Sequence, residues 1–150
     1  MSFVSITVGE ADFDAAGLLT QLEALGGGAV ASFTGIVRGG GGLAAMRLDH
    51  YPAMTEAQIG RIVADAEARW PLLGVVVIHR VGELHPGERI VFVGTASAHR
   101  AAALEACAFL IDWLKTSAPF WKKERFEDGR SEWVEARAED DRARDKWNAD

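Results

Sequence analysis

Hydrophobic positions along this 150-residue chain follow two different spacings, which predicts a domain that contains both strands and helices. Segments in which apolar and polar residues alternate, or in which β-branched residues run together, are typical of strands. The predicted strands span residues 3–8, 29–37, 43–51, 75–78, 90–93, 120–126 and 133–136. The run Val75-Val76-Val77-Ile78 is β-branched throughout, which indicates a strand buried on both faces.

The other apolar residues recur at the spacing of amphipathic helices. A first helix is expected after Asp12 or Asp14, either of which can cap it, and a run of glycines ends it. Thr55 and Gln58 match a capping box at the start of a second helix. The strongest helical pattern spans residues 98–114. Helices are therefore expected between several of the strands.

The order of these elements predicts the fold class. The sequence His85-Pro86-Gly87-Glu88 suits a type II turn and favours an antiparallel pairing of the strands at 75–78 and 90–93. Strands outnumber helices, and the hairpins are local. We therefore expect an α+β fold built on an antiparallel sheet.

Length and composition agree with one folded domain. Hydrophobic residues make up 49% of the chain and charged residues 25%, which excludes a disordered protein. We expect a single domain over residues 1–137. A charged C-terminal tail at 138–150 is expected to be a solvated helix or a loose segment.

Charge and cysteine content exclude several classes of function. The formal net charge of −6 argues against non-specific binding to nucleic acid. Cys107 is the single cysteine, lies on the inner face of a predicted helix and is expected to be a core residue. His50, His79, His85 and His99 lack the spacing of metal ligands, so no metal site is expected. No signal peptide or membrane span is visible, and we expect a cytoplasmic protein.

A basic group lies where a strand passes into the helix at 98–114. Free backbone N–H groups and the positive end of the helix dipole attract anions there, and His99 and Arg100 add donors. The structural alternative is a surface Arg100 beside a His99 that packs sideways. Taken alone, this segment favours the structural alternative.

A second basic group surrounds two aromatic residues. Its members are Lys115, Lys122, Lys123 and Arg125, around Phe120 and Trp121. Lys115 can simply complement the dipole at the end of its helix. A lysine beside aromatic rings is also expected to be partly desolvated, which lowers the pKa of its amine and improves it as an acid, base or nucleophile. We favour a functional role for this group.

A third basic residue, Arg38, precedes the run Gly39-Gly40-Gly41-Gly42. The glycines predict a mobile loop. Arg38 could close over a bound anion as this loop moves, whereas the structural alternative is an edge-strand arginine that discourages aggregation.

These segments together resemble one family. In order, they are 33–38 (FTGIVR), 48–54 (LDHYPAM), 77–84 (VIHRVGEL), 97–100 (SAHR), 114–124 (LKTSAPFWKKE) and 133–137 (WVEAR). Their order is similar to that in the large, catalytic subunit of molybdopterin synthase, the MoaE family. The match runs from about residue 3 to residue 137, and several spaced motifs are far more specific than any one alone.

The resemblance implies an activity and its partners. It implies transfer of sulfur onto cyclic pyranopterin monophosphate, which makes the dithiolene of molybdopterin. The sulfur arrives as a C-terminal thiocarboxylate on a small ubiquitin-like (MoaD-like) subunit. The large subunits form a homodimer with one small subunit at each end, a heterotetramer. The implied fold is an α/β hammerhead with a small additional antiparallel subdomain, and we expect no cofactor.

The resemblance also implies roles for individual residues. The catalytic lysines correspond to Lys115 and Lys122. The substrate-binding residues correspond to Arg38, His99, Arg100, Lys123, Glu124 and Arg137. Ile36 stands where other members often have a lysine, and the loop after Arg38 is reduced to glycines, so both positions are departures from the family pattern.

Two other functions fit the same basic groups. A non-catalytic dimeric module could bind an anionic metabolite or an acidic peptide through them. A phosphoester- or RNA-contacting domain could use Lys122, Lys123 and Arg125, but the negative net charge argues against it. Replacement of Lys115 separates the enzyme from the binding module.

Overall fold

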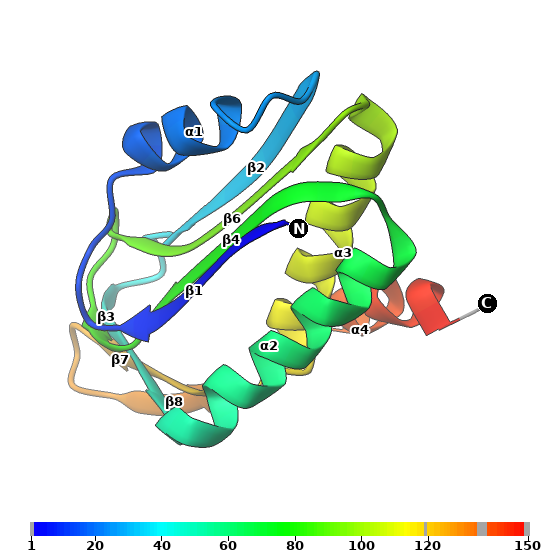
Figure 1. Cartoon of the computed structure of the whole chain (residues 1–150). Coiled ribbons are helices and arrows are strands. Elements are labelled where there is room, and N and C mark those ends of the chain that lie inside the picture. The colour runs from blue at the N-terminus through cyan, green and yellow to red at the C-terminus, as the bar shows by residue number, and fades with distance from the viewer. Residues whose placement is uncertain (1, 119, 135–137, 149–150) are drawn as a thin grey trace.

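The computed structural model describes residues 2–118, 120–134 and 138–148. Their strands form two four-stranded sheets (Figure 1). The first sheet contains, in order, β1 (Phe3–Gly9), β4 (Leu72–Arg80), β6 (Arg89–Ser97) and β2 (Ala29–Ile36). The β4–β6 pair is antiparallel and places Val77 opposite Val93, which confirms the pairing expected from the turn at 85–88.

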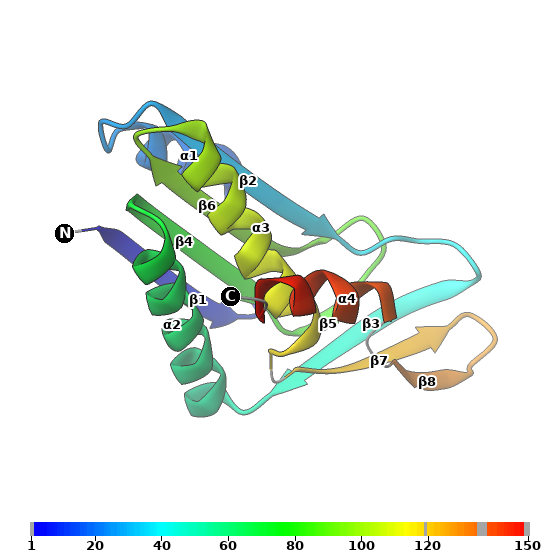
Figure 2. The same ribbon diagram turned by 90° about the vertical axis from the view of Figure 1, so that its right-hand side faces the viewer.

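The second sheet is smaller and fully antiparallel. Its order is β5 (Gly82–Leu84), β3 (Leu43–His50), β7 (Phe120–Phe126) and β8 (Ser131–Val134). Figure 2 shows β3, β7 and β8 extending away from the first sheet, beside the C-terminal end of α3 (Arg100–Thr116). This arrangement creates a junction between the two sheets and the last turn of that helix.

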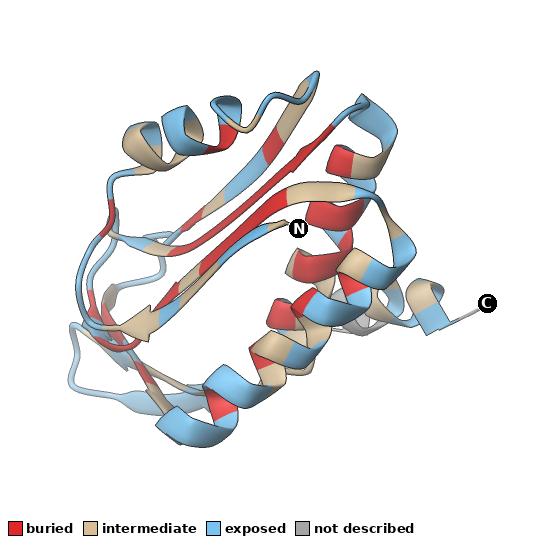
Figure 3. Cartoon of the chain, in the orientation of Figure 1, coloured by how far each residue is buried: buried red, intermediate tan, exposed pale blue. Residues whose placement is uncertain are grey.

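Helices cover both faces of the first sheet. On one face α1 (Ala15–Glu23) packs through Leu22 against Val76 and Phe92. On the other face α2 (Pro52–Arg69) and α3 pack over Val77 and Val93. Because side chains alternate along a strand, the β-branched run serves both cores at once. Its central residues are fully buried, as expected (Figure 3).

Two local features differ from the sequence-based expectations. Strand β1 pairs with β4 in parallel, so the first sheet is mixed at this edge. The capping box at Thr55 is wrong, because α2 begins three residues earlier at Pro52 and the Thr55 hydroxyl donates to the carbonyl oxygen of Tyr51 at 2.9 Å. Proline suits the first helical position because its φ is already helical and its missing N–H needs no partner there.

The charged C-terminal segment forms α4 (Ala138–Asp145) and a short 3-10 helix, η1 (Lys146–Asn148). Trp147 anchors it: its ring lies 5.7 Å from that of Trp70 and 5.5 Å from that of Phe109, between ring centres. Its Nε1 donates to Asp112 at 2.7 Å. Trp147 therefore anchors this segment to the rest of the domain. The domain boundary expected at residue 137 lies outside the described residues.

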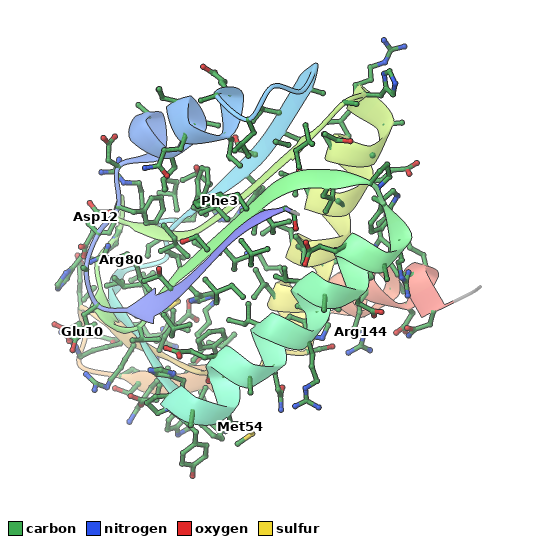
Figure 4. All side chains as sticks on the ribbon, viewed as in Figure 1. Phe3, Glu10, Asp12, Met54, Arg80 and Arg144 are labelled. Atoms are coloured by element: carbon green, nitrogen blue, oxygen red, sulfur yellow. The ribbon has the colours of Figure 1, made fainter. Side chains whose placement is uncertain are left out.

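A buried arginine holds the end of the first sheet where β4 leaves it. Arg80 donates to the carbonyl oxygen of Glu10 from both Nε and Nη2, at 3.1 and 3.0 Å, and to that of Arg89 at 2.9 Å. Figure 4 shows Arg80 beside Glu10 and Asp12. Asp12 forms an ion pair with Arg89 at 3.0 Å, which lowers the pKa of its carboxyl. This network fixes the chain immediately after His79.

No helix among the described residues is both long and apolar enough to cross a membrane.

Replacing Phe92 with alanine is expected to lower the free energy of unfolding by about 3–5 kcal/mol, because it opens a cavity in a fully buried site. Urea denaturation measures the change. Leu104→Ala on the exposed face of α3 is the matched control, with an expected change within about 0.5 kcal/mol. Equal losses in the two variants would contradict the assignment of Phe92 to the core.

Candidate functional site

A cleft of about 620 Å³ lies at the junction of the two sheets and the end of α3. Much of its lining is apolar: Ile36, Val37, Leu43, Met46, Leu48, Ile90, Val91, Ile111, Leu114, Ala118, Phe120 and Val134. Its polar lining consists of Arg38, His79, Lys115, Thr116, Lys122 and Glu124. Among the described residues, the cleft therefore combines an apolar surface with six polar groups, three of which are the cations of Arg38, Lys115 and Lys122.

The alternation of side chains along β7 sorts its basic residues. Lys122 and Glu124 share a face with Phe120 and line the cleft. Lys123 does not line it, and its Nζ lies 5.4 Å from the centre of the Trp133 ring. Lys123, for which a substrate-binding role is expected, is therefore not among the residues that line this cleft.

Lys115 lies in the last turn of α3 and is exposed at the cleft. The expectation that the Lys115 amine is partly desolvated is therefore wrong for a single chain. Of the two aromatic residues, Phe120 lines the same cleft and stacks on His79, whereas Trp121 is 45% exposed. Leu114, one position earlier, is buried and anchors this turn in the core.

Arg38 lies two residues after the end of β2, in the first sheet, and lines the cleft. The glycines after it form a turn in which Gly40, Gly41 and Gly42 all have positive φ, between 62° and 112°. Residues with side chains rarely adopt this conformation, so the glycine run is required by the turn itself. The N–H of Leu43 closes the turn on the carbonyl oxygen of Gly40 at 3.2 Å.

His79 is a cleft residue that the sequence analysis set aside. Its side chain is buried, and its Nδ1 lies 2.8 Å from the carbonyl oxygen of Arg80. Burial lowers the pKa of the imidazole to about 4, and the nearby charge of Lys115 acts in the same direction. The available signal was its position two residues after Val77, which places it on the face of β4 toward α3.

This buried histidine predicts a pH dependence of stability. Between its folded pKa of about 4 and its ordinary value of 6.5, the unfolded chain binds a proton that the folded chain does not. Stability should therefore fall as the pH is lowered through this window, by about 3 kcal/mol between pH 7 and pH 4 from His79 alone. Urea denaturation at both pH values tests this. His79→Asn should show a correspondingly smaller loss, and an equal loss in both proteins would contradict it.

Comparison with known proteins decides the family. A sequence model described as MoaE protein matches residues 8–117. The chain belongs to the MoaE family. It is 50% identical over 149 residues to the molybdopterin synthase catalytic subunit of Pseudomonas aeruginosa, covering 96% of this chain and 99% of that relative. It is 54% identical over 123 residues to the Escherichia coli subunit of the same name, covering 80% and 81% of the two chains.

Solved structures agree with this assignment. A molybdopterin biosynthesis MoaE protein from Burkholderia ambifaria is 44% identical, covers all of both chains and superimposes with a TM-score of 0.82. A molybdopterin synthase structure from Staphylococcus aureus is 28% identical, with a TM-score of 0.77, and the match covers 85% and 95% of the two chains. These matches confirm the family resemblance, the α+β fold and the assignment as an enzyme subunit.

The residues that the MoaE resemblance singles out fall into separate places. Arg38, Lys115, Lys122 and Glu124 share the cleft. His99 and Arg100 do not: they are exposed at the first turn of α3. Arg137 lies outside the described residues.

The length of α3 sets the distance between the two basic groups. The helix separates Arg100 from Lys115 by about 22 Å along its axis. A single chain of this MoaE protein therefore holds two basic groups at opposite ends of one helix.

Proposed function

We propose that this chain is the catalytic subunit of a molybdopterin synthase. In this reaction two sulfur atoms, each supplied by the C-terminal thiocarboxylate of a small ubiquitin-like subunit, pass to cyclic pyranopterin monophosphate, and the dithiolene of molybdopterin forms. The observation that carries the proposal is the cleft in which Lys115, Lys122 and Arg38 face an apolar surface. Membership of the MoaE family supports the same activity.

The lysines suit the charge that develops during sulfur transfer. Once the thiocarboxylate sulfur has bonded to the substrate, water can attack the carbonyl carbon of the resulting thioester, and negative charge forms on a tetrahedral oxyanion. The carbon–sulfur bond of the thioester then breaks, which leaves the sulfur on the substrate and a carboxylate on the small subunit. Lys115 and Lys122 line one cleft and can stabilise that oxyanion or pass a proton. Arg38 can hold the phosphate of the substrate through paired hydrogen bonds. The cleft therefore supplies cationic side chains both for the developing oxyanion and for the phosphate of the substrate.

The sulfur donor must be a partner. Cys107 is the only cysteine of the chain and is buried in the core, where burial raises the pKa of its thiol to about 11. A thiol that stays protonated and buried is a poor nucleophile and a poor sulfur carrier. A partner that delivers sulfur on an extended C-terminal tail suits the cleft that Phe120 lines.

We further propose that the active unit contains two copies of this chain, with one small subunit at each end. His99 and Arg100 lie too far along α3 to share the cleft of their own chain, yet they suit an anionic substrate. In a two-fold dimer, the end of α3 from one copy can lie beside the cleft of the other. We place this assembly in the cytoplasm, where a carrier thiocarboxylate can be made and used.

Reconstitution tests the proposed function. The purified chain, a thiocarboxylated small subunit and cyclic pyranopterin monophosphate are combined, and molybdopterin is measured. Product should form only when all three are present, and a small subunit with an ordinary carboxylate should give none. Absence of product under conditions in which an established synthase is active would overturn the proposal.

A further inference from the structure

We propose that His79 is a specificity-determining residue of the cleft. In this proposal its ring Nε2 accepts a hydrogen bond from an N–H or O–H group on the uncharged end of the bound substrate. The inference rests on the proposed function, since it names a contact within the same site. It is argued from the hydrogen bonding, packing and position of the ring.

The protonation pattern of the ring follows from its hydrogen bond to Arg80. Nδ1 of His79 lies 2.8 Å from the carbonyl oxygen of Arg80. A carbonyl oxygen only accepts, so Nδ1 must carry the hydrogen and donate it. The neighbouring Arg80 is itself fixed by its bonds to the carbonyl oxygens of Glu10 and Arg89. In the neutral ring, Nε2 therefore presents an unprotonated lone pair.

The ring is also held in place by packing. It stacks on Phe120, with 3.9 Å between ring centres and an angle of 20° between the planes. His50 packs against the same phenyl ring at 6.1 Å. The side chain of His79 cannot turn without disturbing the start of β7. Its acceptor atom is therefore pre-positioned for a ligand.

The free nitrogen faces the cleft. His79 is only 7% exposed, and its one hydrogen bond to the residues that the structure describes engages Nδ1. Among the described residues, no fully buried side-chain nitrogen or oxygen lacks a partner, so Nε2 must retain access to solvent. Since His79 lines the cleft, that access is from the cleft. Among the polar side chains of described residues that line the cleft, only His79 is buried.

Charge around the ring favours a neutral acceptor. The charged groups of the cleft are Arg38, Lys115, Lys122 and Glu124, and the His50 ring packs against Phe120. Lys115 and His50 both oppose a positive charge on His79. The site therefore offers cations for an anionic group and one uncharged acceptor for a donor. A phosphorylated pterin carries both, because its ring bears amide and amine N–H groups.

Loss of the acceptor should be costly once a ligand has displaced water. A substrate donor left without a partner weakens binding by about 10- to 100-fold. If the hydrogen bond is equally strong in the bound complex and in the transition state, its loss raises KM and leaves kcat nearly unchanged. His79 would then select donor-bearing rings and discriminate against analogues that carry only an acceptor at that position.

Two amide substitutions separate this role from a structural one. In His79→Asn the amide occupies the place of Nδ1, keeps a donor for the Arg80 carbonyl and removes the acceptor. In His79→Gln the amide reaches the place of Nε2 and restores an acceptor, but the bond to Arg80 is lost. We expect His79→Asn to raise the KM for the pterin by about 10- to 100-fold and His79→Gln to stay within a few-fold of the wild type. A purely structural role gives the reverse order in both activity and melting temperature.

A binding titration with cyclic pyranopterin monophosphate identifies the donor. In a Lys115→Ala background, His79→Asn should still weaken pterin binding if the donor belongs to the substrate. No further weakening would show that Lys115 is the donor and would overturn the proposal.

The same measurements separate this inference from the proposed function. A wild-type chain that turns over normally, with His79→Asn equal to it, overturns the role of His79 alone. A wild-type chain that neither binds nor converts the pterin overturns the proposed function and, with it, the role of His79.

Discussion

Replacing Lys115 with alanine should lower kcat by about 10²- to 10⁴-fold while the chain remains folded. Lys115 lines the same cleft as Lys122, where its ammonium can stabilise an oxyanion or transfer a proton. Because Lys115 is exposed, its removal opens no cavity in the core. The lost cation at the end of α3 should cost no more than about 1 kcal/mol of stability.

Single-turnover assays with saturating pterin and thiocarboxylated small subunit isolate this effect from binding. Lys146→Ala is the matched control, because it also removes one lysine charge and lies outside the cleft, where Lys146 pairs with Asp112 at 3.8 Å. Its activity should equal that of the wild type. If Lys115 only contacted phosphate, Lys115→Ala would weaken binding by about 1–3 kcal/mol and retain kcat at saturation. That outcome would favour the binding module over the enzyme.

Local sequence patterns predicted most elements of the fold because each depends on neighbours in the chain. Strand β7 begins and ends where the alternation predicts, at Phe120 and Phe126. The antiparallel β4–β6 pair follows from a short connection. The parallel β1–β4 pair was not predicted, because its strands are far apart in sequence and no local pattern encodes the partner. Pairing across such distances is set by the packing of the whole sheet.

The candidate site was predictable only in part for the same reason. Alternation separates Lys122 and Glu124 from Lys123, but only the packing of the second sheet decides which face meets the cleft. His79 was hidden because it continues a buried strand, where a histidine is usually structural. The stacking of Phe120 on His79 joins residues that are far apart in the sequence, and no local pattern records such a contact.

Mixing two inactive variants should restore activity if two copies share each site. Lys115→Ala removes a cleft lysine, and Arg100→Ala removes a cation about 22 Å away at the other end of α3. A dimer with one chain of each kind has one doubly defective site. Its other site is intact, because it combines Lys115 from one chain with Arg100 from the other. Random mixing should therefore recover about a quarter of the wild-type activity.

The experiment co-expresses the variants with different affinity tags and isolates dimers that carry both. These dimers should approach half the activity of the wild type, since one site in each is complete. Mixing Lys115→Ala with Lys122→Ala is the control, because both residues line the cleft of one chain and every mixed site stays defective. If Arg100 acted within its own chain, or only on the surface, its mixture with Lys115→Ala would show no more activity than the separate variants predict. A gain in the first mixture alone would place the two ends of α3 in one site built from two chains.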